Sequence, residues 1–540
     1  MMRVRLKIFL SIFVFSYSSA NPIWDEATPY PLEGVPNPYQ LPDEEYFKNI
    51  RSGLIHSQNY PVEITGILLP YYPIKKFANL TPLRFDDLQS WLGLHVYPEN
   101  ENKDEYYIPF PDSKRPEDRI GLSLIKINST TGFTFSCAAC HSGQLFGRTV
   151  LGLTNRFPRA NELFVLGRKA FQVLPSPLFK QLVAGSKADR ELYKRSRTNI
   201  RSVAAVRPQQ LGLDTSLAHV ALSLARRAPD IYASKNKYFE QHPRPEPLNH
   251  FVSDSKPAVW WNVKYKNRWL LDGSVVSGNP ILTNILWNEI GRGTDLLELE
   301  GWFEKNQKTI QELTTAVFSS RSPLITDFFS ADRFDIGLAK RGEAIFNRRC
   351  AHCHGQYVKN WSLDGADRLP LKEQLKTLRV LYHEQTPVID VGTDPQRALG
   401  MKSLLQLNDL SLSKKYGIAI RAQRGYVPPP LVGIWARWPY FHNNSAPSLC
   451  AVLTPEFDRP ETYWAGDAND PETDFDFDCN GYPSGGRVPQ KWRRYRELLF
   501  DTQKPGLSNK GHSEGILVRD SKLLVTSQDR TALIHFLQTL

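Results

Sequence analysis

Cysteine and methionine are scarce in this chain of 540 residues, which has six cysteines and three methionines. Six cysteines are too few to form the framework of a disulfide-dense scaffold of this length. No apolar run reaches the ~20 residues that span a bilayer, so the sequence predicts no stable membrane span. Hydrophobic residues make up 41% and charged residues 23%, which excludes a disordered chain and indicates a globular one.

The first 20 residues have the pattern of a signal peptide. Arg3, Arg5 and Lys7 precede an apolar stretch over residues 8–15, and small residues end at Ala20. Residues 1–20 are therefore predicted to be a signal peptide, with an uncleaved membrane anchor as the alternative. The mature protein is expected to be periplasmic or secreted in a bacterium. Cleavage removes three basic residues and lowers the net charge from +11 to +8.

The partners expected for this chain are a small-molecule oxidant and a redox protein, and not a nucleic acid. A basic surface of this size can steer an acidic partner towards the protein. Nucleic acid is not expected as a partner, because the exported chain contains no dense run of lysine and arginine. The most basic stretch, residues 190–201, is expected to be a solvated face of a helix.

Four of the six cysteines fall in two short motifs of the form C-x-x-C-H. The first motif is Cys137-Ala138-Ala139-Cys140-His141 and the second is Cys350-Ala351-His352-Cys353-His354. This spacing is typical of c-type haem attachment, because two thiols form thioethers with the porphyrin and the next histidine gives the iron an axial nitrogen. The composition predicts far less than one such match by chance. The sequence therefore predicts two covalently attached haem c groups, with His141 and His354 as iron ligands.

Cysteine motifs of this kind have two other uses in proteins. A thioredoxin-like redox pair uses C-x-x-C but does not need the histidine that follows. A zinc site would have to draw ligands from motifs that lie more than 200 residues apart, or find others elsewhere. Cys450 and Cys479 remain, and in an oxidising compartment they are expected to form a disulfide, with two separate buried thiols as the alternative.

The fold is predicted to be mainly α, with two cytochrome c-like haem domains that carry long, loop-rich insertions. Residues 21–334 would form the N-terminal haem domain, in which residues 21–110 look like an extended wrap and helices are expected over 213–227 and 302–318. Residues 335–540 would form the C-terminal cytochrome c domain. There, a helix is expected over 335–350, with Gly342 allowing close approach of another helix. A terminal helix is expected to begin at a capping box formed by Thr526 and Asp529.

Six segments carry a resemblance to a known family, and they follow one another in the same order as in that family. They are residues 135–144, 257–274, 337–355, 391–401, 433–449 and 509–515. In these segments the chain resembles the diheme cytochrome c peroxidase superfamily, and within it the diheme rubber-oxygenase-like c-type cytochromes. The resemblance implies an N-terminal haem with an open or exchangeable distal side, where peroxide or dioxygen binds. It also implies a C-terminal haem with two histidine ligands, which stores or relays an electron.

The resemblance assigns further site residues. His512 is implied as the second ligand of the C-terminal haem, opposite His354, with Met401 as the alternative. Trp260 and Trp261 match a segment that resembles the distal wall of the N-terminal haem, and they are the candidate catalytic residues, with ordinary core positions as the alternative. His442 would hydrogen-bond a haem propionate, line the gap between the domains, or be an ordinary structural residue, whereas His352 is not expected to be a ligand.

The favoured function is a haem-dependent oxidoreductase that uses peroxide or dioxygen at the N-terminal haem. The alternative is a non-catalytic diheme electron-transfer cytochrome, with both irons six-coordinate. That alternative needs a second ligand for the first haem, and the candidates are His56, His95, His219, His242, His250 and Met401. A haem sensor or binding protein is a third hypothesis.

Overall fold

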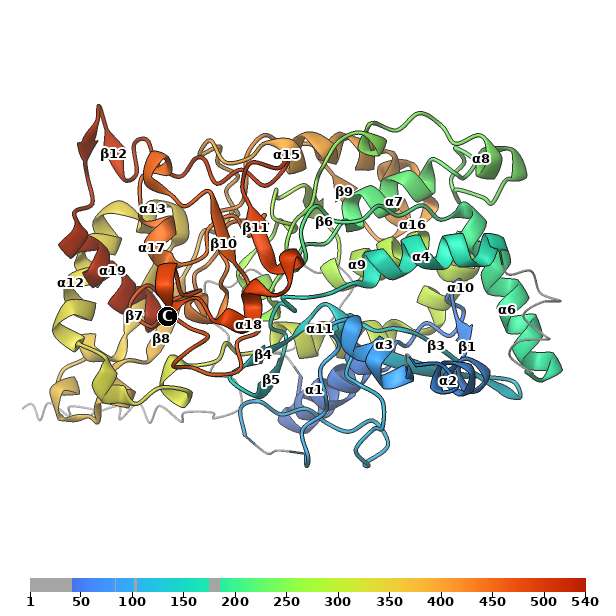
Figure 1. The fold of residues 1–540 in the computed structure, drawn as a ribbon, viewed down its shortest axis with the longest axis horizontal. Helices are drawn as coiled ribbons and strands as arrows, with labels where there is room; N and C mark the ends of the chain where they lie inside the picture. Colours follow the sequence, from blue (N-terminus) through green and yellow to red (C-terminus); the bar gives the residue numbers. More distant parts are fainter. Residues whose placement is uncertain (1–40, 83, 102–103, 174–184) are drawn as a thin grey trace, which may run out of the picture.

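The computed structural model describes residues 41–82, 84–101, 104–173 and 185–540, and the predicted signal peptide lies outside them. This part of the chain is mostly helical, with short strands, as predicted (Figure 1). Within it, no helix is both long enough and apolar enough to cross a membrane.

Most of the longer helices belong to the N-terminal part of the chain. The helices before residue 335 are α1 (Asp43–Gln58), α2 (Tyr71–Asn79), α3 (Phe85–Trp91), α4 (Ala160–Val173), α6 (Lys187–Asn199), α7 (Ser216–Leu224), α8 (Lys237–Gln241), α9 (Pro280–Gly291), α10 (Leu296–Lys305) and α11 (Gln307–Phe318). Those that follow are α12 (Ile336–Arg349), α13 (Ala351–His354), α14 (Leu371–Gln374), α15 (Gln396–Gly400), α16 (Ser411–Lys415), α17 (Leu449–Val452), α18 (Gln490–Arg493) and α19 (Ser527–Gln538).

The strands form small antiparallel sheets and not one central sheet. They are β1 (Leu69–Pro70), β2 (Leu122–Ile127), β3 (Thr130–Phe135), β4 (Ser142–Leu145), β5 (Arg148–Leu151), β6 (Val275–Ser277), β7 (Gln356–Lys359), β8 (Thr377–Leu381), β9 (Ala419–Ile420), β10 (Thr462–Trp464), β11 (Leu499–Asp501), β12 (Val518–Arg519) and β13 (Lys522–Leu523). Strands β1, β3 and β2 pair in that order, and the hairpin of β4 and β5 begins directly after the first haem motif.

The predicted extended wrap over residues 21–110 is wrong for its described part, which contains α1, α2 and α3. Two prolines of this region stand at the starts of helices and do not interrupt them. Pro42 caps α1 and Pro70 caps α2, where a missing backbone N–H costs no helical hydrogen bond. The predicted helix over 302–318 is divided, because α10 ends at Lys305 and α11 begins at Gln307.

Two helices frame the C-terminal haem motif, α12 and α19, and Figure 1 shows them side by side. A Cβ atom at Gly342 would lie 2.0 Å from the backbone oxygen of Ala532, so the predicted close approach at this glycine is confirmed. The predicted capping box is also confirmed, since the Thr526 side chain accepts a hydrogen bond from the Asp529 backbone and the Asp529 side chain accepts one in return.

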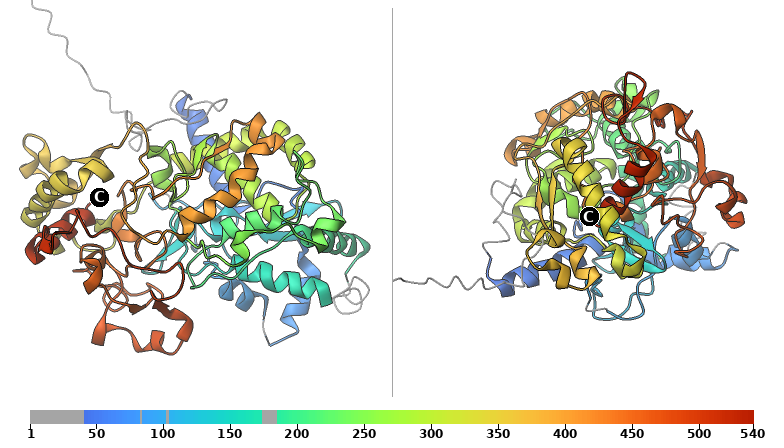
Figure 2. Two further views of the ribbon diagram at one scale, coloured as in Figure 1. Left: turned by 90° about the horizontal axis from the view of Figure 1, so that it is seen from above. Right: turned by 90° about the vertical axis from the view of Figure 1, so that its left-hand side faces the viewer.

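The two large hydrophobic cores exchange segments across the predicted boundary between residues 334 and 335. Met401, Leu404 and Leu407 are buried in the core formed mainly by residues 204–313, and β9 pairs with β6. In the opposite direction, Val259 and Trp261 belong to the core of the C-terminal part. Figure 2 shows the orange segment near residue 400 among the green helices of the N-terminal part. The two halves are therefore interlocked.

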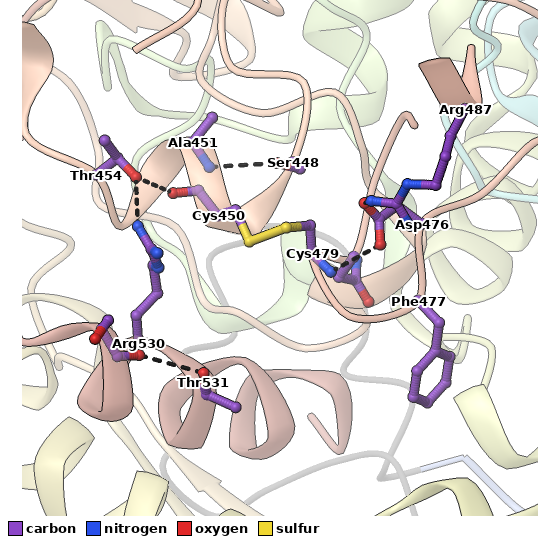
Figure 3. The surroundings of a disulfide bond; sticks show 12 residues. Ser448, Cys450, Ala451, Thr454, Asp476, Phe477, Cys479, Arg487, Arg530 and Thr531 are labelled. Atoms are coloured by element: carbon purple, nitrogen blue, oxygen red, sulfur yellow. Dashed lines mark hydrogen bonds and ion pairs between the residues drawn. A yellow bond between two sulfur atoms is a disulfide. The ribbon is translucent and has the colours of Figure 1, made fainter. Parts of the chain in front are cut away.

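Cys450 and Cys479 form a disulfide, as predicted (Figure 3). The bond ties α17 to the loop before residue 480, and the Cys450 backbone N–H also donates to the Cys479 carbonyl over 3.3 Å. The Ser448 side chain caps α17 by accepting a hydrogen bond from Ala451. These contacts fix the position of a short helix whose residues line the cavity described below.

Replacing both cysteines of this bond by serine (C450S/C479S) is expected to lower the free energy of unfolding by about 3 kcal/mol, because the disulfide restricts the unfolded chain. Denaturant unfolding of the full chain, with and without reductant, measures the effect. The midpoint of the wild type should fall in reductant, and that of the variant should not move. Equal stability of the two oxidised proteins would contradict the expectation.

Candidate functional site

The second C-x-x-C-H motif lies at the end of α12, where the chain turns into the short helix α13. The backbone N–H groups of Cys353 and His354 both donate to the Cys350 carbonyl over 3.0 Å, and Gly355 ends the turn at a φ of 78°. Both thiols of the motif are free. Cys350, Cys353 and His354 line one cavity of about 210 Å³. Much of its wall is apolar and comes from Phe346, Leu449, Val452, Leu453, Leu533 and Leu537.

His512 lies in the same cavity, with its ring centre 6.3 Å from that of His354. An imidazole nitrogen binds a transition metal at about 2.0 Å and lies ~1.1 Å from its own ring centre, so two imidazoles that share one metal have ring centres about 6 Å apart. His354 Nδ1 donates to the Pro429 carbonyl over 2.9 Å, which leaves Nε2 as the nitrogen available to a metal. The spacing of these two histidines therefore fits one iron between them.

The loop that carries His512 is held by a buried arginine. Arg459, 5% exposed, donates through Nη1 to the Gly511 carbonyl over 2.7 Å and through Nη2 to the His512 carbonyl over 3.2 Å. His512 itself has a φ of 49°, and its backbone N–H donates to the Val391 carbonyl over 2.7 Å. A non-glycine residue with positive φ needs such support from its surroundings.

Burial keeps His354 and His512 uncharged at neutral pH. It lowers the pKa of His354 to about 4, and it lowers the pKa of His512 to about 3, with the neighbouring His354 adding to the effect. A neutral imidazole presents the lone pair that metal coordination requires. The electrostatics of the cavity thus agree with its geometry.

Of the other residues named from the sequence, His442 and His352 line the cavity of His354, and Met401 does not. Met401 is fully buried in the core of the N-terminal part and does not line the cavity of His354. His442 does line it, and its ring stacks on Tyr426 with centres 4.1 Å apart. His352 also borders this cavity, but it is exposed to solvent.

The same cavity contains cationic residues that sequence reasoning missed. Lys256 and Arg437 line it, and Lys256 Nζ donates to the Pro439 carbonyl over 2.7 Å. Burial lowers the pKa of Lys256 well below its usual value and that of Arg437 to about 10. No spacing rule could have found Lys256, because it lies nearly 100 residues before the motif that it faces.

The first C-x-x-C-H motif follows directly from β3. Its backbone is folded by the Cys137 carbonyl, which accepts from the N–H groups of Cys140 and His141 over 3.3 and 3.1 Å. Both thiols and His141 line a second cavity, of about 120 Å³. His141 Nδ1 donates to the Ala258 carbonyl over 2.8 Å, just as His354 does to Pro429. Burial also lowers the pKa of His141.

One of the six candidate second ligands of the predicted first haem, His219 on α7, lines this cavity. The residue is 7% exposed, its Nε2 atom is buried without a hydrogen-bond partner, and burial lowers its pKa to about 4. The remaining candidates, which are His56, His95, His242, His250 and Met401, are not among the residues that line it.

Polar residues border this second cavity as well. Asn161, Asp214 and Arg292 belong to its lining. Arg292 donates to the Phe135 carbonyl over 2.8 Å and lies 3.6 Å from the buried carboxylate of Glu289. The first motif therefore opens onto a more polar cavity than the second.

Trp260 and Trp261 are both buried, but neither lines the cavity beside His141. The ring of Trp260 lies 5.9 Å from the ring of His141. Trp261 Nε1 donates to the Val432 carbonyl over 2.8 Å, and the neighbouring Asn262 side chain donates to the Pro430 carbonyl over 2.8 Å. These bonds join the segment that contacts His141 to the segment that contacts His354.

The described residues contain no cluster of three or more His, Cys, Asp or Glu side chains arranged to hold a metal ion.

Comparison with known proteins finds a cytochrome c-like segment. Residues 425–465 match a sequence family described as RoxA-like, cytochrome c-like, and this segment supplies Tyr426, Arg437 and His442 to the cavity of His354. A cytochrome c-like domain implies a haem c cofactor, and the match supports a relation to rubber-oxygenase-like cytochromes at a coarse level.

Two relatives come from Sinorhizobium fredii (strain NBRC 101917 / NGR234). The chain is 24% identical over 516 residues to the uncharacterized protein y4iJ, an alignment that covers 79% of this chain and 80% of that protein. It is 27% identical over 222 residues to the uncharacterized protein y4iM, covering 35% of this chain and 44% of that protein.

Proposed function

We propose that this chain is an exported diheme c-type cytochrome that acts as an oxidoreductase on peroxide or dioxygen. Cys137 and Cys140 would attach one haem and Cys350 and Cys353 the other, in two haem domains that cover residues 21–334 and 335–540. The observation that carries the proposal is the 6.3 Å spacing of His354 and His512 in a cavity that also contains both thiols of the second motif. When bound, haem c supplies an iron that passes single electrons and, where a coordination position is free, binds a small oxidant.

The residues of the second cavity suit electron relay. His354 and His512 would both bind the iron of this haem, and Arg459 would keep His512 in place through the loop carbonyls. The apolar wall excludes water, and Lys256 and Arg437 would neutralise propionate groups at the cavity edge. Two strong nitrogen ligands leave no position for an oxidant and favour outer-sphere electron transfer.

The residues of the first cavity suit the binding of a small oxidant. His141 would bind the iron of the first haem, with its Nδ1 proton held by the Ala258 carbonyl. Asn161 and Arg292 are hydrogen-bond donors that line the cavity, where they would orient peroxide or dioxygen.

We propose that Trp260 and Trp261 lie between the two haem sites and do not form the distal wall of the N-terminal haem. Ala258 accepts the hydrogen bond of His141, and Trp261 lies three residues later along the same segment. The Trp261 indole is bonded to Val432, three residues after the Pro429 carbonyl that accepts from His354. This connected route would carry electrons between the two axial histidines.

The alternative, a non-catalytic electron carrier, draws support from His219. Its unpartnered Nε2 lies in the cavity of the first motif, where it would make that iron six-coordinate. The two functions differ in their response to oxidants, because only an open iron binds them.

Mixing the reduced holoprotein with hydrogen peroxide or dioxygen tests the proposal. We expect oxidation of both haems, with and without polyisoprene as an organic substrate.

The W261F variant tests the route between the two sites. It should slow oxidation of the second haem at least about tenfold, because it loses the hydrogen bond to the Val432 carbonyl. W435F is the matched control, since the Trp435 indole donates to Pro323 instead. Failure of both oxidants to react would contradict the proposed activity, and equal rates in the two variants would contradict the route.

A further inference from the structure

A third cavity, of about 420 Å³, lies outside both haem sites and is bordered mainly by cations. It is formed by α4, α6, the turn after α6, the end of α7 and α8. Its charged lining consists of Arg168, Arg197, Arg201, Arg226, Lys237 and Glu240. Part of the basic stretch expected to be a solvated helix face thus lines a hollow.

The protein balances the positive charges of this cavity only in part, because one carboxylate, that of Glu240, lies among five cations and acts on Arg226. Within the described ranges, none of the five cations forms an ion pair with a carboxylate. Arg197 Nε donates to the Phe171 carbonyl over 3.0 Å, and Arg226 Nη1 donates to the Glu240 carbonyl over 2.5 Å. Hydrogen bonds to neutral carbonyl groups hold the side chains in place but do not neutralise their positive charges.

Partial burial makes the charged form of these arginines less favourable. It lowers the pKa of Arg226 to about 10, with repulsion from Arg168 as the next cause, and it lowers the pKa of Arg168 as well. An anion placed among these groups would relieve the repulsion.

We propose that this cavity binds a multivalent oxyanion of the phosphate class. Four of the five cations are arginines, whose planar guanidinium groups pair with phosphate through two parallel hydrogen bonds. The cavity volume is many times the ~30 Å³ that one water molecule occupies, so it has room for more than one phosphate group. The ligand is therefore a polyphosphate or the headgroup of a phospholipid.

The cavity shares two helices with the first haem site. Arg168 lies on α4, which also supplies Asn161 and Phe164 to the cavity of His141. Arg226 lies two residues beyond α7, which carries His219. The anion site would therefore share helix α4 with that cavity, although its binding does not depend on the proposed activity.

Calorimetric titration of the full-length holoprotein with tripolyphosphate, and sedimentation with vesicles containing phosphatidylglycerol, test the proposal. The variant R168Q/R201Q/K237Q removes three cations for which the described structure records no hydrogen bond. The control R494Q/R519Q/K522Q removes three exposed cations elsewhere, so both variants lose the same charge. At about 150 mM salt, general surface attraction is largely screened.

We expect tripolyphosphate or the vesicles to bind the wild type and the control alike, and to bind the cavity variant at least about tenfold more weakly. Loss of tripolyphosphate binding alone identifies a free phosphate compound, and loss of vesicle binding alone identifies a lipid headgroup. Equal binding by the two variants would overturn the proposal, because it would show only an effect of net charge. Absence of binding of both probes to the wild type would also overturn it.

Discussion

Replacing Cys350 and Cys353 together by alanine is expected to halve the covalently bound haem of this protein. Both thiols are free and both line the cavity of His354, so they are placed to form the two thioether bonds of one haem c. Without these bonds the second haem should be lost on acid-acetone extraction. Pyridine haemochrome absorbance per polypeptide should fall from about two haems to about one.

The matched experiment removes the other pair, Cys137 and Cys140, and should also leave about one haem. The two variants should differ in which haem they retain, so their spectra should add up to that of the wild type. C450S/C479S is the control, because it removes two cysteines that form a disulfide and should retain both haems. Unchanged haem content in either alanine variant would contradict the assignment of its motif. If a variant does not accumulate, mass spectrometry of haem-bearing peptides from the wild type gives the same answer.

Replacing His512 by alanine is expected to convert one of the two haems, and only one, from low spin to high spin. The ring of His512 is 6.3 Å from that of His354, the spacing of two imidazoles on one metal, and its low pKa keeps it ready to bind. Loss of this nitrogen leaves the iron with a weaker ligand field. Electron paramagnetic resonance of the ferric protein should show the low-spin signal of the second haem replaced by a high-spin signal.

M401L is the control for this experiment, because Met401 was the alternative ligand and lies in the core of the N-terminal part. It should leave the spectrum unchanged. A high-spin signal in M401L, or an unchanged spectrum in the His512 variant, would show that the ligand has been assigned wrongly.

The features that sequence reasoning predicted correctly depend on short-range patterns. The helix that leads to Cys350, the capping box at Thr526 and the close approach at Gly342 each rest on residues a few positions apart or on a single glycine. The disulfide between Cys450 and Cys479 followed from counting, since the two motifs left one pair of cysteines. Local rules were sufficient for these features.

The features that were missed depend on contacts between distant parts of the chain. Arg459 holds the His512 loop from 53 residues away, and nothing in its own neighbourhood in sequence marks it. Lys256 reaches the cavity of a motif in the other half of the chain. The side on which Trp260 and Trp261 lie depends on how residues 258–262 pass between the two cores. Such placements are set by tertiary packing, which no spacing in the sequence encodes.

We propose that one iron of this protein would be closed by two histidines and that the other would be open to small molecules. Titrating the fully reduced holoprotein with carbon monoxide, while following the Soret band, tests this most directly. We expect about one carbon monoxide bound per two haems in the wild type, and about two in the H512A variant. Binding of none by the wild type would mean that His219 or another residue closes the first iron, and binding of two would mean that His512 does not close the second.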